Sequence, residues 1–384
     1  MPDTTAIRAF LDDRHLTMAK DVTAFARDVV AQYPEPADDD GGRVQARELA
    51  VVLGEAGWYT PIEQLDLRGV SLVREALGWA SPLADAVYAL QALGTVPILL
   101  AGDDAQQERW AKPALRGEQI AAFAMTEAEA GSDVAAMSTT ATRDGDDYVL
   151  QGTKTLISNA GIADFYTVFA STDPSSGSRG MSCFVVPADA DGFEFVEPLV
   201  LSAPHPLGTI AFNGCRVPAS HRLGPEGEGF KLGLRTLDLL RGTVGAAACG
   251  MATRALDASL EYADRRRQFG KPLAEFQLIQ QKLARMATDL TAARLLVYRS
   301  AWEKDGGAER VTLEAAMAKV FATEAAQRII DDAVQIHGGQ GVLRASVVDR
   351  LYRSVRALRI YEGTTEIQHL IIAGQLLKAY RSNR

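Results

Sequence analysis

The spacing of apolar residues changes twice along the chain, and these changes limit the folds that it can adopt. Up to about residue 120 apolar residues recur at helical spacing, as in AIRAFLDDRHLTMAKDVTAFARDVVA. From about 123 to 230 the apolar segments are short, rich in β-branched and aromatic residues, and separated by Gly, Pro, Asp and Asn, which is typical of strands. From 231 onward long helical stretches return.

This order predicts a mainly α protein with an inserted β domain. We expect an N-terminal α-helical domain over 1–120, a middle β domain over 121–230 and a C-terminal bundle of about four helices over 231–384. Strands and helices do not alternate, and neither GxGxxG nor a GxxxxGK phosphate loop is present. The common nucleotide-binding folds are therefore excluded.

Composition narrows the function classes further. A formal net charge of -9 argues against a nucleic-acid partner, which requires a basic face. The three cysteines are far apart and the five histidines scattered, so we expect neither disulfides nor a metal site. We find no apolar run of the ~18 residues that a membrane span needs and no basic-then-apolar start. These features predict a cytoplasmic protein with no membrane segment.

Four short stretches could carry chemistry. FAMTEAEAGSD, at 123–133, offers hydroxyls and free amides to a flat heterocycle or a phosphate, although such stretches are more often plain strand-to-loop junctions. RRRQFGKPLAEFQ, at 265–277, places arginines at a helix end, where they stabilise the helix dipole or grip a pyrophosphate. QIHGGQG, at 335–341, ends a helix with more glycines than a cap needs. RIYEGTTEIQ, at 359–368, contains Glu362, which is either a loop acid before a helix capped by Thr364 or a base.

Taken together, MTEAEAGSD, RRRQFG, QIHGGQG and RIYEGTTEIQ resemble the acyl-CoA dehydrogenase family of flavoproteins in their order and spacing. The resemblance covers essentially the whole chain, because that family also runs from a helical domain through a β domain to a helical bundle. It implies FAD-dependent α,β-dehydrogenation of an acyl-CoA thioester to the trans-2-enoyl-CoA. Flavin N5 accepts the hydride, and the electrons pass to an electron-transfer flavoprotein. A homotetramer is the family expectation.

The resemblance also assigns roles to single residues. Glu362 matches the catalytic base, and burial beside Tyr361 under an acyl chain is expected to raise its pKa. Residues that match cofactor contacts are Phe123, Met125, Thr126, Gly131, Ser132, Ile157, Ser158, Arg266, Phe269, Gln277, Gln335, Gly338, Gly339, Thr364 and Glu366. Among these, Gln277 and 335–339 resemble contacts made from a neighbouring subunit. Residues that match substrate contacts are Ser132, Asp238, Arg241, Tyr361 and Gly363. For Asp238 and Arg241 an exposed, salt-bridged helix face is nearly as good an interpretation.

The chain departs from the family pattern in four places. Ala128 and Glu129 replace the Pro-Gly common in the TEPGAGSD loop, and Leu156 stands where many members have an aromatic residue beside the flavin. An aliphatic side chain cannot stack on a ring as an aromatic one does. TPIEQLDLRG and SAPHPLG also differ from the usual segments, which puts the shape of the acyl pocket in question.

Three alternatives stay open at this point. The fold could serve a flavin monooxygenase, although the retained YEG motif argues against one. It could serve a non-catalytic flavin-binding relative of the DNA-associated kind, which the acidic balance opposes. The acyl group could also arrive on a carrier protein. The sequence leaves the length, branching and ring character of the acyl group undetermined.

Overall fold

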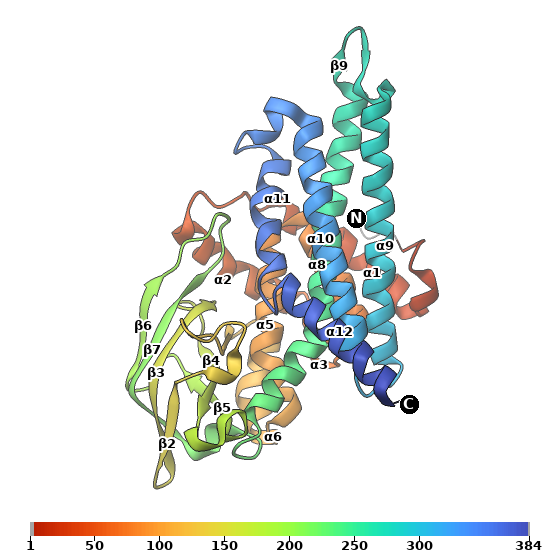
Figure 1. Ribbon diagram of the computed structural model, residues 1–384. Helices are drawn as coiled ribbons and strands as arrows, with labels where there is room; N and C mark the ends of the chain where they lie inside the picture. Colours follow the sequence, from red (N-terminus) through yellow and green to blue (C-terminus); the bar gives the residue numbers. More distant parts are fainter. Residues whose placement is uncertain (1–3, 383–384) are drawn as a thin grey trace. The chain divides into compact units, whose positions relative to one another are not determined.

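A computed structural model describes residues 4–382 and has the predicted order of helices, strands and helices (Figure 1). The predicted fold class, mainly α with an inserted β domain, is confirmed. The chain forms two compact units, one of 1–34, 66–85 and 238–384 and the other of 35–65 and 86–237. Helices α5 and α8 run through the boundaries at 85 and 237. The expected boundaries at 120 and 230 stay a prediction.

Helices dominate the chain before the sheet. They are η1 (Arg8–Phe10), α1 (Asp13–Asp28), η2 (Val30–Gln32), α2 (Asp39–Glu55), α3 (Thr60–Glu63), α4 (Leu67–Ala80), α5 (Pro82–Ala101), α6 (Asp104–Gln106), η3 (Gln107–Ala111) and α7 (Lys112–Leu115). Their starts follow capping rules: Asp38 accepts a hydrogen bond from the amide of Gly41 at the start of α2, and Asp66 accepts one from Gly69 at the start of α4. The sequence therefore fixes these starts locally.

Helix α5 is the one helix of the described chain that is long and apolar enough, by length and composition, to cross a membrane. It is an exception to the expectation that the chain has no apolar run of ~18 residues. Of its most apolar 18-residue window, 78% is buried inside the protein, as in the core helix of a globular fold.

The middle of the chain forms an eight-stranded sheet. Its strands are β1 (Ala121–Ala124), β2 (Thr140–Asp144), β3 (Asp147–Ser158), β4 (Phe165–Ser171), β5 (Met181–Pro187), β6 (Phe193–Pro198), β7 (Leu207–Pro218) and β8 (Arg222–Leu223). The short helices η4 (Val134–Ala136), η5 (Pro174–Gly180) and η6 (Ala219–His221) connect them. The strand order is β6-β7-β3-β2-β4-β5-β8, with β1 parallel to β4. The strand character predicted for the segments between about 123 and 230 is therefore confirmed.

Long helices form the last third of the chain. They are α8 (Gly229–Arg265), α9 (Gln277–Asp305), α10 (Thr312–His337), α11 (Val347–Val355) and α12 (Thr365–Ser382). A hairpin of β9 (Arg267–Gln268) and β10 (Lys271–Pro272) lies between α8 and α9, followed by η7 (Leu273–Glu275). The short helices η8 (Gly338–Val342) and η9 (Arg356–Arg359) flank α11. As the QIHGG pattern predicts, α10 ends at His337 with Gly338 at φ 57°.

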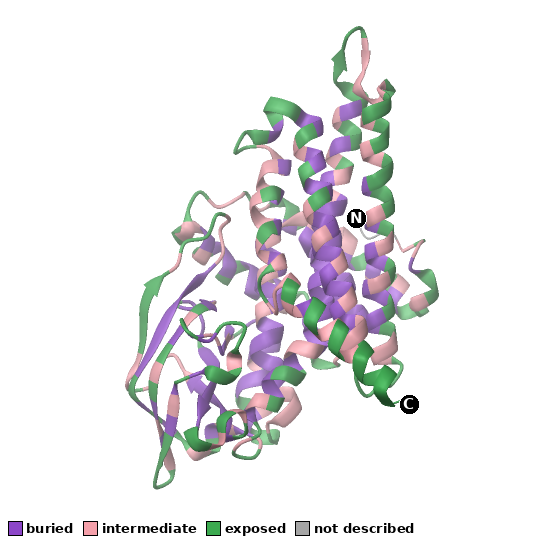
Figure 2. Cartoon of the chain, viewed as in Figure 1, coloured by how far each residue is buried: buried purple, intermediate pink, exposed green. Residues whose placement is uncertain are grey.

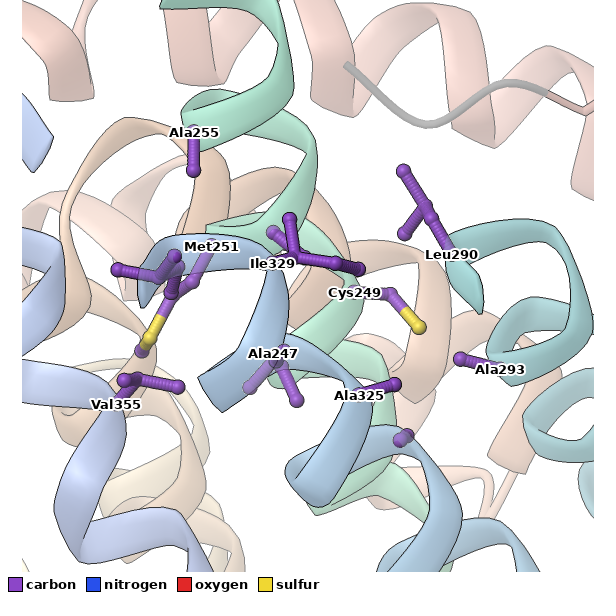
Figure 3. Close-up of a cluster of buried hydrophobic side chains, with 14 of the residues drawn as sticks. Ala247, Cys249, Met251, Ala255, Leu290, Ala293, Ala325, Ile329 and Val355 are labelled. Carbon is purple, nitrogen blue, oxygen red and sulfur yellow. The ribbon is translucent and has the colours of Figure 1, made fainter. Parts of the chain in front are cut away.

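Small side chains let these helices approach closely. Figure 3 shows alanines, Cys249 and Met251 of α8 facing Leu290 of α9 and Ile329 of α10, all of them buried. A Cβ on Gly250 would lie 2.1 Å from the carbonyl oxygen of Glu75, so α4 and α8 touch along their backbones. This core positions α4, α8 and α10 around the residues described next.

Candidate active site

Glu362 lies in a tight turn between η9 and α12. Its φ is 54° and that of Gly363 is 92°, so two consecutive residues are in the left-handed region. The hydroxyl of Thr364 accepts a hydrogen bond of 3.4 Å from the amide of Ile367, which caps α12. The Glu362 side chain is only half-buried overall, but its Oε2 atom is buried and has no hydrogen-bond partner within residues 4–382. Such an atom is suited to a group that is not part of the protein.

Three cationic side chains of the same compact unit act on Glu362. They come from three helices: Arg74 from α4, Arg241 from α8 and Lys319 from α10. Arg74 is fully buried and donates two hydrogen bonds to Asp85, of 2.8 and 3.0 Å, and one of 3.0 Å to the hydroxyl of Thr243. The fold therefore brings together charges that are far apart in the sequence.

Burial is the largest influence on the pKa of Glu362. Burial raises the pKa of the Glu362 carboxyl above its ordinary value of 4.5, while Arg74, Lys319 and Arg241 act against it. The expectation of a raised pKa is thereby confirmed in direction. A carboxyl tuned upward in this way is better matched to accepting a proton near neutral pH. Tyr361, its neighbour in the chain, also has a raised pKa, because burial disfavours the phenolate.

Arg241 is nearly fully buried, so an exposed helix face is the wrong interpretation for this residue. Its Nη1 donates to Asp238 over 3.0 Å, and the second carboxylate oxygen of Asp238 accepts from Thr312 over 2.9 Å. The Nε atom of Arg241 is buried without a partner in the described chain. An unpaired buried N–H beside the base leaves a donor for a bound molecule. The substrate-binding roles of Asp238, Arg241, Tyr361 and Gly363 stay predictions.

In the other compact unit, the TEAEAGSD loop is held at its base by a buried ion pair. Lys154 donates to Glu127 over 2.9 Å and to the carbonyl of Met125 over 3.1 Å. The same carboxylate accepts hydrogen bonds from the amides and hydroxyls of Ser138 and Thr139. Every oxygen of Glu127 is therefore satisfied, and the loop between 127 and 138 is closed at its ends.

The outer part of this loop suits a flat cofactor with a phosphate. The hydroxyls of Thr126 and Ser132 have no partner in the described chain, and a Cβ on Gly131 would meet nothing within 4 Å. Leu156, at φ 54° and 57% exposed, lies on β3, next to Ile157 and Ser158. These free donors and the open backbone fit the ring and pyrophosphate of FAD.

The remaining residues predicted for the cofactor divide by burial. In the β region, Met125 and Ile157 face the core, Phe123 packs on Phe169 at 4.9 Å between ring centroids, and Ser158 shares a 2.8 Å hydrogen bond with His205. The remaining predicted residues are exposed and belong to the helical bundle, near the end where Tyr262 stacks on His337. These are Arg266, Phe269, Gln277, Gln335, Gly338 and Gly339. Glu366, also exposed, begins α12. All these cofactor roles stay predictions.

Sequence reasoning missed Arg74, Lys319 and Asp85. Lys319 carries a usable signal, because it falls between Ala315 and Ala322 on the buried face of an apolar helix. A lysine at such a position is rarely buried without a purpose. Arg74 and Asp85 carry no comparable local signal.

One cluster of metal-ligand types occurs in the described chain: His15, Asp66 and Asp305. Its carboxylates are already bonded to protein donors. Nε2 of His15 lies 3.1 Å from Asp66, and Asp305 accepts from the side chain of Arg68 and from the amides of Leu67 and Arg68. These contacts cap α4, so the cluster has a structural explanation.

The chain matches three family models along its length. The family models for the acyl-CoA dehydrogenase N-terminal, middle and C-terminal domains match residues 12–118, 122–215 and 227–377. A three-part fold of this family is that of an FAD-dependent oxidoreductase. The chain belongs to the acyl-CoA dehydrogenase family.

Three relatives illustrate the match. The chain is 40% identical over 382 residues to the 3-(aryl)acrylate reductase of Clostridium sporogenes, covering 96% of this chain and 100% of that protein. It is 42% identical over 292 residues to the CarC subunit of the caffeyl-CoA reductase-Etf complex of Acetobacterium woodii, covering 73% and 75%. The solved butyryl-CoA dehydrogenase of Megasphaera elsdenii is 35% identical and superimposes with a TM-score of 0.89 over 96% of this chain and 99% of that one.

Proposed function

We propose that this enzyme interconverts an acyl-CoA thioester and its trans-2-enoyl-CoA, with Glu362 as the base. The observation that carries the proposal is the buried Glu362 Oε2, which has no protein partner in the described chain and a raised pKa. Glu362 accepts the proton from the carbon next to the thioester carbonyl. FAD, when bound, supplies the hydride acceptor for the neighbouring carbon.

The protein's own groups prepare this step. The three cationic side chains, Arg74, Arg241 and Lys319, stabilise the ionised form of Glu362 against the effect of burial. The unpaired Nε–H of Arg241 offers a hydrogen bond to the substrate's thioester part. In the other unit, free hydroxyls on the closed loop support the assignment of Thr126 and Ser132 to the cofactor.

A decisive test uses the FAD-loaded enzyme without oxygen. We expect acyl-CoA thioesters to bleach the flavin, and Glu362→Gln to retain FAD and thioester binding while losing about 10²- to 10⁴-fold of the bleaching rate. Near-normal bleaching by the variant would mean that another residue is the base. Fast reaction of the reduced enzyme with oxygen would instead favour the monooxygenase alternative.

A second candidate function is the reverse reaction on an aryl substrate. Two relatives, the aryl-acrylate reductase and the caffeyl-CoA reductase subunit, are named as reductases of aryl-substituted acrylates. The same two carbon atoms react in both directions, so the base and the loop serve either. The substrate panel should therefore pair butyryl-CoA with 3-phenylpropionyl-CoA, and crotonyl-CoA with cinnamoyl-CoA. A clear preference for the aryl pair supports the reductase.

We propose an electron-transfer flavoprotein as the redox partner, supported by the Etf complex named for the relative from Acetobacterium woodii. Mixing the substrate-reduced enzyme with this partner should restore the oxidised flavin spectrum faster than air does. Equal rates with and without the partner protein would count against it. A carrier-protein thioester is tested in the same assay by replacing CoA with an acyl carrier protein.

We also propose a homotetramer. Figure 2 shows α12 mostly in the colours of exposed and intermediate residues. Gln368 is its one buried residue, and its exposed apolar side chains include Leu370 at 68%, Leu377 at 52% and Tyr380 at 57%. Contiguous exposed apolar side chains of this size are typical of a protein interface. Light scattering should give four times the 41.3 kDa chain mass. Leu370→Glu combined with Leu377→Glu should reduce that mass, whereas an unchanged tetramer would place the interface elsewhere.

A further inference from the structure

The turn that carries Glu362 is strained. A non-glycine residue at φ 54° lies in the left-handed region, which is unfavourable for a residue with a Cβ atom. Gly363 follows at φ 92°, and a Cβ there would lie 2.5 Å from Nε2, the side-chain amide nitrogen of Gln368. Surrounding contacts must therefore hold this turn, because the chain's own preference does not.

Two buried donors hold one carbonyl of the turn. The oxygen of Gly363 accepts a hydrogen bond of 2.7 Å from Nζ of Lys319 and one of 2.9 Å from Nε2 of Gln368. The same amide nitrogen of Gln368 lies 3.4 Å from the carbonyl oxygen of Glu362. Lys319 and Gln368 are both fully buried. Together they fix the peptide planes on either side of the Cα atom of Gly363, the residue that follows Glu362.

Lys319 is unusual for a buried lysine. The bond to Gly363 is the one hydrogen bond of its ammonium group within the described chain, and no carboxylate of that part lies within ion-pair distance of its Nζ atom. An ammonium group has three donors, and burying it without an ion pair is strongly unfavourable. A fold that tolerates this cost retains the charge for a reason other than stability.

Lys319 and Glu362 each shift the pKa of the other through their charges. Burial lowers the pKa of Lys319 to about 8, and Glu362 is the strongest of the groups that oppose this. The other charges that act on Lys319 are Arg241, Glu324 and Glu366. The other charges that act on Glu362 are Arg74, Arg241 and Asp85. Lys319 thus favours the carboxylate form of Glu362, as Glu362 favours the ammonium form of Lys319.

We propose that Lys319 is a positioning residue for the reaction: its ammonium group holds the Gly363 carbonyl, which fixes the strained turn, and its charge keeps Glu362 ionised and ready to accept a proton. The inference rests on the proposed function of Glu362. Lys319 gives up no proton in this step. When Glu362 takes the substrate proton and becomes neutral, the lysine remains protonated and bonded to the carbonyl.

The test measures proton abstraction directly. The FAD-loaded enzyme is incubated in deuterium oxide with an acyl-CoA, and NMR follows the loss of the signal of the hydrogens next to the thioester across pH. The variants are Lys319→Met, which removes donor and charge, and Lys319→Gln, which keeps a donor without the charge. Lys20→Met, at an exposed lysine of α1, is the matched control. FAD content and the urea unfolding midpoint show that each variant is folded.

Removing the charge should raise the pKa of Glu362 and shift the exchange profile to higher pH in both Lys319 variants. A shift of one unit lowers the ionised fraction about tenfold at a pH below both values. Lys319→Met should in addition lose maximal rate, because the turn is no longer held. Above pH ~8 the wild type and Lys319→Gln should converge, because Lys319 itself becomes neutral there.

The outcomes separate this inference from the proposed function. Folded Lys319 variants with wild-type exchange rates and pH profiles would overturn the positioning role, provided that Glu362→Gln is inactive. Altered stability with an unchanged profile would likewise make Lys319 merely structural. Near-normal exchange in Glu362→Gln would remove the base assignment itself, and the role of Lys319 with it.

Discussion

Two buried lysines, one in each compact unit, have a glutamate as neighbour, yet the two pairs differ in what they leave unbonded. Lys154 and Glu127 are 2.9 Å apart, and every oxygen of that carboxylate accepts a hydrogen bond. Lys319 and Glu362 influence each other electrostatically without a direct ion pair, and Glu362 Oε2 has no partner in the described chain. The same residue types therefore form a fully bonded, locked pair in one unit, Lys154 and Glu127, and leave a carboxylate oxygen unbonded in the other.

The acidities follow from this difference. Burial acts to raise the pKa of Glu127, but Lys154 and Thr139 outweigh it and lower the pKa to about 2. Burial of Glu362 is not outweighed, and its pKa rises. A satisfied carboxylate is held in its charged form, whereas an unsatisfied one is poised to accept a proton.

The largest expected effect is on the locked pair. Lys154→Met leaves Glu127 buried and uncompensated, so the free energy of unfolding should fall by about 3–5 kcal/mol. Urea unfolding followed by circular dichroism measures it. Lys319→Met should cost less, because no ion pair is broken there, and a larger loss at Lys319 would reverse the comparison. The double variant Lys154→Met with Glu127→Gln should recover part of the stability.

Acid should affect the locked pair next. The folded pKa of Glu127 is about 2 against an ordinary value of 4.5, so its stabilising contribution is complete above pH 4.5 and is lost as the pH falls toward 2. The midpoint temperature of thermal unfolding of the wild type should fall as the pH is lowered across that window, and the fall should be smaller in Glu127→Gln. Identical slopes for the two proteins would remove Glu127 as the source.

A smaller effect of opposite sign is expected at the base. Glu362→Gly relieves the backbone strain at φ 54° and removes an unsatisfied buried oxygen, so unfolding should become harder by ~1 kcal/mol while turnover disappears. Differential scanning calorimetry tests this, with Glu366→Gly on the exposed start of α12 as a control that should not stabilise. A destabilised Glu362→Gly would mean that the side chain contributes to the fold.

The smallest effect is expected at a fully solvated pair. Glu108 and Lys112 form an ion pair on the surface of the first helical region, and both side chains are mostly exposed. Lys112→Met should leave the unfolding midpoint unchanged, because solvent and salt screen such pairs. A clear loss of stability here would show that the presence of an ion pair, rather than its burial, decides how much stability each variant loses.

The sequence was sufficient for the fold, and it drew attention to Glu362 but not to the surroundings of that residue. Period changes and glycine caps are local signals, so the strands from 147 to 218 and the end of α10 at His337 were predictable. The charges around the base come from α4, α8 and α10, and their convergence depends on packing that no local pattern encodes. The φ of Leu156 and the bulge beside it in β3 were also invisible, because strain is imposed by tertiary contacts.

Helix α12 begins three residues after Glu362, packs on α10 and buries only Gln368 within the described residues. If the proposed tetramer forms through α12, a neighbouring subunit that binds this helix also steadies the turn of Glu362. Activity is then expected to fall on dilution while each subunit is still folded, so that protein concentration becomes a variable in any assay of this enzyme.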